Sequence, residues 1–259
     1  MTGKMARYQL ILAYDGARFE GSQRQADRRT AQGELEKALR TIGWTGRSVL
    51  IAGRTDSGVH AEGQCAAVDF EWTHGPEKLR AALNAALPPD LAVRVVKEAS
   101  PDFHPRFDAS SRLYRYLLFC DPVRDPVRER YAWRVWPEVD GSLLQSASQV
   151  FPGRHDFAAF GSPMSRGGST VRTVMLSTWS LSDGEWQFQV QADAFLYRMV
   201  RRLVYVQVAA AQGRVDVNDL RTALDGVGKQ RAEAKRNLPA GLAAPCGLSL
   251  VQIQYDDRD

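Results

Sequence analysis

Hydrophobic and polar positions along the chain divide it into short segments with the periodicity of strands and helices. Alternating or short apolar runs predict strands at residues 8–14, 48–51, 64–70, 91–96, 112–119, 171–180, 186–194 and 248–255. Apolar residues at helical spacing predict helices at residues 31–42, 76–87, 143–151, 195–212 and 217–224. Strands and helices that alternate in this mixed order are typical of an α+β fold.

Two of the helices carry clear end signals. Thr30 is suited to be the N-cap of the first helix, and Gly43 ends that helix. Pro76 stands at the first position of the next helix, which Pro88 and Pro89 terminate. By contrast, the charged segment 228–244 contains Pro239 and is predicted to be an exposed loop.

The second half of the chain repeats the order of elements in the first half, although no repeat of individual residues is visible. We therefore predict two pseudo-symmetric α+β domains, residues 1–104 and 105–259. Each is expected to be a mainly antiparallel sheet with helices on one face.

Composition fits a globular protein that works in a reducing compartment. The 259 residues are 44% hydrophobic and 25% charged, enough for a large core. The three cysteines, Cys65, Cys120 and Cys246, are far apart in sequence, which argues against a disulfide framework or a zinc site. The N-terminus lacks an apolar signal region and no apolar run reaches membrane-spanning length. We therefore expect a cytoplasmic protein.

Positive charge is in slight excess and is clustered. Lys and Arg number 34 against 30 Asp and Glu, a net charge of +4. The clusters are Arg124, Arg128, Arg130 and Arg134; Arg198, Arg201 and Arg202; and Lys229, Arg231, Lys235 and Arg236. Each alone is typical of a solvated face, but three in one chain slightly favour a polyanionic partner such as nucleic acid.

The richest local pattern is the string from Ala52 to Ala61, AGRTDSGVHA, between two predicted strands. It places Asp56 on a connecting loop two residues after Arg54, and catalytic groups concentrate on such loops. Thr, Asp, Ser and Gly also form ordinary turns by local hydrogen bonding. From the residue types alone, a structural turn is the better interpretation.

Other chemistries have less support. Asp56, His60 and Glu62 would converge on a metal only if their segment were helical, which Thr-Asp-Ser-Gly disfavours. Ser57 lacks the G-x-S-x-G context of a hydrolase nucleophile. The chain has no Walker loop and no G-x-G-x-x-G, so neither a metal nor a nucleotide cofactor is expected.

The string around Asp56 resembles the catalytic signature of the TruA-type tRNA pseudouridine synthases, and the resemblance extends across nearly the whole chain. Its further blocks, in the expected order, are residues 14–16, 21–25, 30–36, 83–88, 103–107, 111–116, 155–157, 172–173, 194–201 and 244–248.

The resemblance implies a cofactor-free, homodimeric α+β enzyme that isomerises uridine in the anticodon stem-loop of tRNA, at tRNA positions 38, 39 and 40. It assigns Asp56 as nucleophile, Arg201 as the cation that keeps this carboxylate ionised, and Tyr114 as the residue that stacks on the flipped base. Asp56 and Arg201 come from the two halves, so the family's active site lies in a basic cleft between them. Arg54 is expected to order the loop and contact the substrate, and Tyr116 is expected to be core.

Four residues depart from the family pattern. Ser22 stands where Trp is usual, Asp193 where Asn is common, Tyr205 where Gly is frequent, and Cys246 where Pro is usual. None of them is at Asp56, Tyr114 or Arg201, and what Ser22 and Tyr205 mean for RNA docking or packing stays open. Two alternatives stay open: a catalytically silent RNA-binding protein or tRNA chaperone on the same fold, and a metal-dependent hydrolase.

Overall fold

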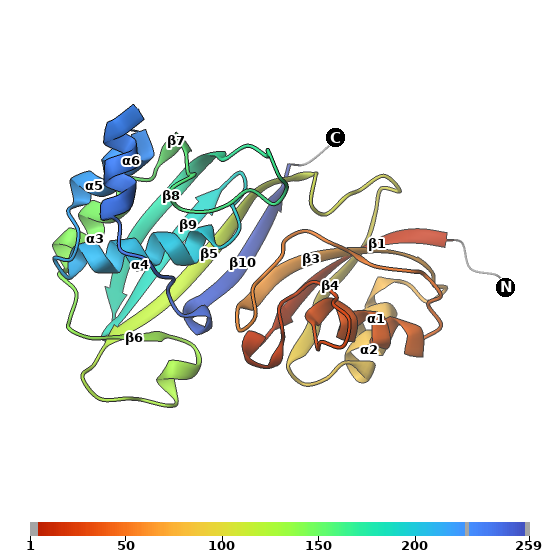
Figure 1. Cartoon of the computed structure of the whole chain (residues 1–259). Helices are drawn as coiled ribbons and strands as arrows, with labels where there is room; N and C mark the ends of the chain where they lie inside the picture. The colour runs from red at the N-terminus through yellow and green to blue at the C-terminus, as the bar shows by residue number, and fades with distance from the viewer. Residues whose placement is uncertain (1–4, 226–227, 257–259) are drawn as a thin grey trace. The chain divides into compact units, whose positions relative to one another are not determined.

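The computed structural model describes residues 5–225 and 228–256 and divides the chain into two compact units (Figure 1). Unit 1 consists of the residues up to Ser110 together with those from Ser249 onward, and unit 2 is Ser111–Leu248. The last strand thus belongs to unit 1, although it follows the whole of unit 2 in sequence. Each unit combines mainly antiparallel strands with helices, which is the mixed composition of the predicted α+β fold.

The sheet of unit 1 has the strand order β4-β1-β3-β10, with the short β2 paired to β3. Its strands are β1 Met5–Tyr14, β2 Leu50–Ile51, β3 His60–Glu71, β4 Leu91–Ala99 and β10 Leu248–Tyr255. β1 runs antiparallel to both β3 and β4, whereas β10 joins β3 in parallel, with Ser249 opposite His60. The central strands β1 and β3 are rich in buried residues. They give the loop that precedes β3 a rigid base.

The helices in the described part of unit 1 are η1 Gly16–Arg18, a short 3₁₀ helix, and the α-helices α1 Ala31–Thr41 and α2 Pro76–Ala86. Thr30 caps α1 as predicted, because its hydroxyl accepts a hydrogen bond from Gly33 N at 3.2 Å. Pro76 occupies the first turn of α2. Leu35 and Leu79 are fully buried in the apolar stripes of the two helices.

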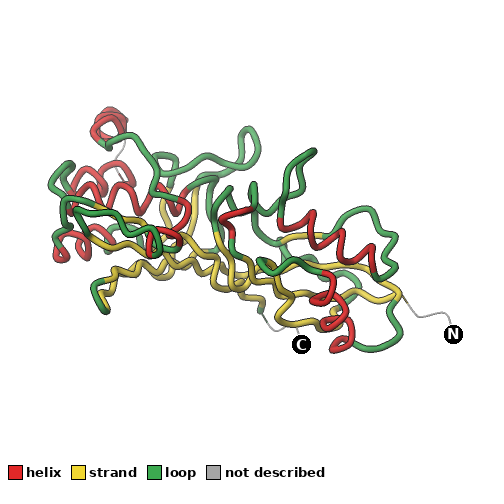
Figure 2. Tube along the Cα trace, turned by 90° about the horizontal axis from the view of Figure 1, so that it is seen from below, coloured by secondary structure: helices red, strands yellow, loops and turns green. Residues whose placement is uncertain are grey.

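Unit 2 contains a sheet of order β5-β9-β8-β7, with β6 paired in parallel to β5. Its strands are β5 Ala109–Cys120, β6 Trp133–Val135, β7 Gly153–Asp156, β8 Val171–Ser182 and β9 Glu185–Ala192. Its helices are η2 Arg128–Arg130, α3 Gly141–Ser148, α4 Met199–Ala211, α5 Val217–Asp225, α6 Gly228–Asn237 and η3 Pro245–Gly247. Figure 2 shows the helices of this unit gathered on one side of its strands, with α4 crossing in front of them in Figure 1.

Two predictions in unit 2 were wrong. Residues 228–237 form helix α6 rather than a loop. The segment has good helix formers but no clear apolar stripe. Among its described side chains Ala234 is buried, as is Leu238 just beyond its end. The helix predicted from residue 195 begins at Met199, because Arg198 adopts a left-handed φ of 61° that a helix cannot contain. Throughout residues 5–225 and 228–256, no helix is long and apolar enough to cross a membrane.

Candidate active site

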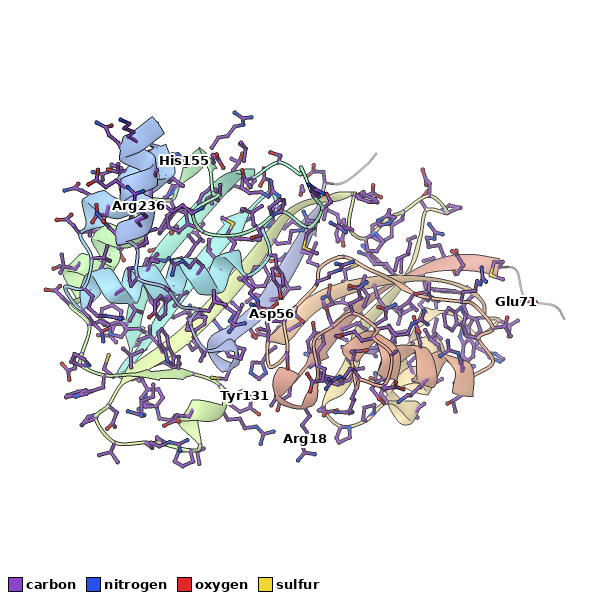
Figure 3. The ribbon with its side chains drawn as sticks, in the orientation of Figure 1. Arg18, Asp56, Glu71, Tyr131, His155 and Arg236 are labelled. Carbon is purple, nitrogen blue, oxygen red and sulfur yellow. The ribbon has the colours of Figure 1, made fainter. Side chains whose placement is uncertain are left out.

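Asp56 lies on the loop of residues 52–59, which connects β2 to β3 in unit 1 (Figure 3). Its side chain is half-buried. The loop closes on itself where Val59 N donates to Asp56 O at 3.2 Å, and Gly58 takes a φ of 78° that glycine adopts without strain. The segment is therefore a turn, as its residue types alone predict, and this turn presents Asp56 next to the start of a buried strand.

Side chains from β1 and β3 hold this loop in place. Gln64 is fully buried; its Nε2 donates to Gly53 O at 2.7 Å and its Oε1 accepts from Gly53 N at 3.2 Å. Tyr14 Oη lies 2.9 Å from Thr55 Oγ1. Burial raises the pKa of the Tyr14 phenol, so the group remains neutral and can serve as a lasting hydrogen-bond partner.

Ser22 is a third support, and sequence reasoning gave it no such role. It is fully buried, and its Oγ accepts a hydrogen bond from Thr55 N at 2.8 Å. The available sequence signal was its place among residues 21–25, one of the blocks that resemble the family. Its departure from the usual Trp thus has a structural account.

Arg54 shares this loop with Asp56, but its side chain is exposed. Within the described residues it makes no hydrogen bond or ion pair. The contacts that order the loop come instead from Tyr14, Ser22 and Gln64. A contact of Arg54 with the substrate remains a prediction.

His60 holds β3 to the turn at the end of β1. Its buried Nδ1 accepts a hydrogen bond from Gly16 N at 3.0 Å and lies 3.2 Å from Asp15 Oδ1. A Cβ on Gly16 would come within 2.0 Å of Val59 O, so only glycine allows this close approach. In the described part of the chain, no group of three or more His, Cys, Asp and Glu side chains could hold a metal ion.

Tyr114 and Tyr116 both lie in β5 of unit 2, with different surroundings. Tyr114 is 9% exposed and its ring packs edge-on against Phe195, with 5.1 Å between ring centroids. Tyr116 is 0% exposed and its hydroxyl donates to Ala244 O at 2.7 Å. Burial raises the pKa of Tyr116 well above its ordinary value. Tyr116 is thus the core residue, as predicted.

Arg201 lies in the first turn of α4 in unit 2. Its Nε donates to Ala243 O at 2.8 Å, and Ala243 N donates to Arg201 O at 3.1 Å. These two bonds tie the helix to the segment that precedes η3. The positive charge of Arg201 also lowers the pKa of Tyr116, against the larger effect of burial, so the two side chains are close enough to interact.

The first arginine cluster lies in residues 121–135 of unit 2, a long loop that includes η2 and β6, and most of its side chains make contacts within the unit. Arg124 and Arg134 both donate to Glu129, at 3.1 Å and 3.0 Å. Arg128 lies over the Phe119 ring, 4.0 Å from its centroid. Arg124 and Arg134 therefore stabilise their own loop, and Arg128 packs against β5, which weakens the inference that this cluster follows an RNA path.

Tyr205 forms part of the wall of an open pocket in unit 2 of about 470 Å³. Its ring is nearly parallel to that of Trp133, with 6.3 Å between centroids and 17° between planes. A Cβ on Gly241 would lie only 2.4 Å from the Tyr205 ring. Trp133 and Gly241 thus accommodate the tyrosine, and its departure from the family pattern is a matter of packing.

Comparison with known proteins decides the family. The family model described as tRNA pseudouridine synthase matches residues 10–108 and 147–256, well over half of the chain. A tRNA pseudouridine synthase A of Chloroflexus aurantiacus is 39% identical over 253 residues, covering 95% of this chain and 87% of that protein. Proteins of the same name from Brevibacillus brevis and Listeria innocua are both 37% identical, each covering 97% of this chain and 100% of the relative.

The chain belongs to the tRNA pseudouridine synthase family. It is therefore an enzyme of the isomerase class. The family model covers the Asp56 loop in unit 1 and the Arg201 region of unit 2. Among solved structures, one titled "Crystal Structure of a Cbf5-Nop10-Gar1 Complex" shares 11% identity at a TM-score of 0.31, covering 82% of this chain and 55% of that chain.

Proposed function

We propose that this pseudouridine synthase family member isomerises uridine to pseudouridine in the anticodon stem-loop of tRNA, at tRNA positions 38, 39 and 40, with Asp56 as the nucleophile. The observation that supports it best is the Asp56 loop itself. Ser22 and Gln64 hold its backbone and Tyr14 holds the Thr55 side chain, so the Asp56 carboxylate is presented from a rigid support. A carboxylate is an established type of covalent nucleophile in enzymes.

The reaction needs few groups. The N1–C1′ bond of uridine breaks, the base turns over, and a C5–C1′ bond forms while C5 loses its proton and N1 gains one. Nothing is oxidised, reduced or added, so the chemistry requires no cofactor. A nucleophilic Asp56 would hold one fragment covalently while the base turns.

Arg201 and Tyr114 complete the proposal. The family resemblance assigns Arg201 as the ionic partner of Asp56, because a nearby cation keeps a carboxylate ionised and therefore nucleophilic. Its Nε bond to Ala243 O fixes the plane of the guanidinium. Tyr114 would stack on the flipped base, a contact worth about 1–3 kcal/mol per base. The exposed Arg54 would contact the RNA backbone.

We further propose that the enzyme acts on tRNA as a cytoplasmic homodimer and without a metal. The second candidate is a catalytically silent RNA-binding protein or tRNA chaperone on the same fold. The two candidates predict equal tRNA binding but different turnover, so they can be separated by measuring the two properties on the same variants.

The test is tritium release from tRNA labelled at C5 of uridine, followed by mapping of pseudouridine in the product. Asp56→Asn keeps the side-chain shape but removes the charge, so it should abolish release while tRNA binding survives. Asp183→Asn is the matched control, because Asp183 lies in the exposed β8–β9 turn with a φ of 51° that asparagine also adopts. No release by the unaltered enzyme would favour the silent RNA-binding protein. Turnover by Asp56→Asn within tenfold of the parent would refute the nucleophile assignment.

A further inference from the structure

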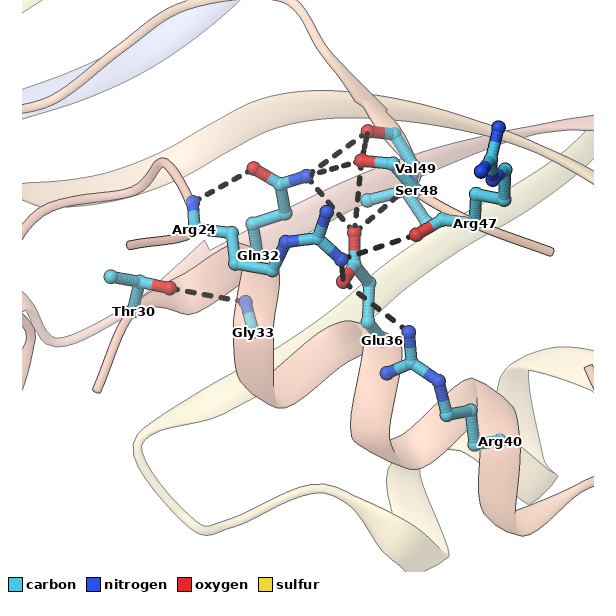
Figure 4. A network of polar contacts seen from close by, with 9 residues as sticks. All are labelled: Arg24, Thr30, Gln32, Gly33, Glu36, Arg40, Arg47, Ser48 and Val49. Carbon is cyan, nitrogen blue, oxygen red and sulfur yellow. Dashed lines mark hydrogen bonds and ion pairs between the residues drawn. The ribbon is translucent and has the colours of Figure 1, made fainter. Parts of the chain in front are cut away.

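A buried carboxylate in the middle of α1 is the centre of a polar network in unit 1 (Figure 4). The Glu36 side chain is 1% exposed, yet its Oε1 lies within hydrogen-bond distance of three donors. These are Gln32 Nε2 at 3.0 Å, Ser48 Oγ at 3.2 Å and Val49 N at 3.1 Å. Its Oε2 accepts from Arg24 NH1 at 2.7 Å. A buried charge is tolerated when it is this fully hydrogen-bonded.

The same network fixes residues 21–24, which we call the tether. Gln32 Oε1 accepts from Arg24 N at 2.9 Å. At the N-terminus of α1, where backbone N–H groups lack partners within the helix, Gln32 N donates to Ser22 O at 2.9 Å and Ala31 N donates to Gly21 O at 3.4 Å. Both ends of the tether are therefore attached to α1 or to its buried glutamate.

The tether in turn holds the backbone next to Asp56. Ser22 N donates to Thr55 O at 3.1 Å, and Thr55 N donates to Ser22 Oγ at 2.8 Å. Ser22 Oγ also lies 3.4 Å from Gly53 O. The approach is close enough that a Cβ on Gly21 would come within 2.8 Å of Thr55 O, and Gly21 has a φ of 91°.

We propose that Ser22 is a positioning residue for the isomerisation: it fixes the peptide of Thr55 and so the location of the adjacent Asp56, and the Glu36 network holds Ser22 in place. This inference rests on the proposed role of Asp56 as nucleophile. Among residues 5–225 and 228–256, no other side chain pairs with Thr55 N, while Tyr14 and Gln64 contact other atoms of the loop.

Removal of the Ser22 hydroxyl is expected to displace Asp56. Thr55 is 8% exposed, so removal of the Ser22 hydroxyl leaves a buried backbone N–H without an acceptor. The loop then relieves the unpaired group by moving, and Asp56 moves with it. Because misplacing a reacting group by about 1 Å can cost roughly a hundredfold in rate, the isomerisation step should be affected far more than tRNA binding.

The test compares Ser22→Ala, Ser22→Cys and Ser177→Ala with the parent in single-turnover tritium release at saturating enzyme. Ser177 is the matched control, because it is a buried serine of unit 2 whose Oγ donates to Ser148 O at 2.8 Å. Ser22→Ala should slow isomerisation by about tenfold to a hundredfold, with the tRNA dissociation constant within about threefold of the parent. Ser22→Cys has a weak acceptor of similar size and should give an intermediate rate. Ser177→Ala should have the isomerisation rate and the tRNA dissociation constant of the parent.

Amide hydrogen exchange supplies a readout that does not depend on activity. The Thr55 amide should exchange faster in Ser22→Ala and not in Ser177→Ala. A Ser22→Ala rate within threefold of the parent, or a loss confined to tRNA affinity, would overturn the positioning role. If Ser22→Ala does not fold, the rate of Ser22→Cys decides in the same way. If the parent itself releases no tritium, the proposed function fails, while the exchange of Thr55 still reports whether the tether holds the loop.

Discussion

Glu36 in unit 1 and Glu129 in unit 2 are each bound by arginines, yet Glu36 connects several segments of the chain whereas Glu129 stabilises one loop. Glu36 is 1% exposed and accepts hydrogen bonds from Arg24 and from backbone and side chains of three other residues. The Glu129 side chain is 22% exposed, and its partners Arg124 and Arg134 lie five residues away on either side. The first glutamate joins a helix, the tether and a loop, whereas the second closes a single loop on itself.

The difference shows that the surroundings of an ion pair, more than its residue types, determine what it can do. Donors around Glu36 that lost their acceptor would be left unsatisfied in the protein interior, while donors around Glu129 would turn to water. In unit 1 the pair therefore supports the geometry of the candidate active site. In unit 2 the arginine cluster that suggests an RNA path in the sequence is mainly occupied with its own loop.

The largest expected effect is on stability. Glu36→Ala leaves the buried Val49 N without its acceptor and removes the hydrogen bond from Arg24. An unsatisfied buried group costs about 1–3 kcal/mol, and a hydrogen bond to a charged group contributes about 1.5–3 kcal/mol. We therefore expect the free energy of unfolding to fall by roughly 2–4 kcal/mol, measured by urea denaturation. The free energy of unfolding should fall by much less in Glu129→Ala. This smaller loss should shrink further in high salt, because salt screens exposed charges. Equal losses in the two variants would contradict the distinction between them.

The sequence could predict most of the elements but only part of the site. Thr30 and Pro76 mark the starts of their helices, and the string around Asp56 indicates both its turn and its proposed chemistry. Helix α6 was missed because its charged residues leave no clear apolar face, so only packing reveals it. Ser22 was missed because one serine carries no local signal of burial. Its partner, Thr55 N, lies 33 residues away in sequence.

An effect of intermediate size is expected on the salt dependence of tRNA binding. It should distinguish an exposed arginine from one that is hydrogen-bonded within the protein. Arg54 is exposed and, within the described residues, unpaired, whereas Arg134 donates to Glu129 and to Asp121 O. If Arg54 contacts a tRNA phosphate, Arg54→Gln should lower affinity and reduce the slope of log affinity against log salt by about 0.7–0.9. Arg134→Gln should leave that slope unchanged. Salt titrations of tRNA binding measure both, and identical slopes for all three proteins would remove Arg54 from the RNA contact surface.

The smallest expected effect is the pH dependence of the structure of the loop 121–135. The hydrogen bond from Arg124, joined by that from Arg134, lowers the pKa of the Glu129 carboxyl. A carboxyl whose pKa is lower in the folded state stabilises that state above its unfolded pKa and loses this contribution as the pH falls through the folded value. The loop 121–135 should therefore be closed at neutral pH and open progressively below about pH 4. Limited proteolysis with an acid-stable protease, from pH 5 down to pH 2, should show cleavage in this loop rising in the parent. In Glu129→Gln, which has no charge to lose, cleavage should already be raised at pH 5 and should change less with acid. A parent and variant with the same pH profile would mean that Glu129 does not hold the loop closed.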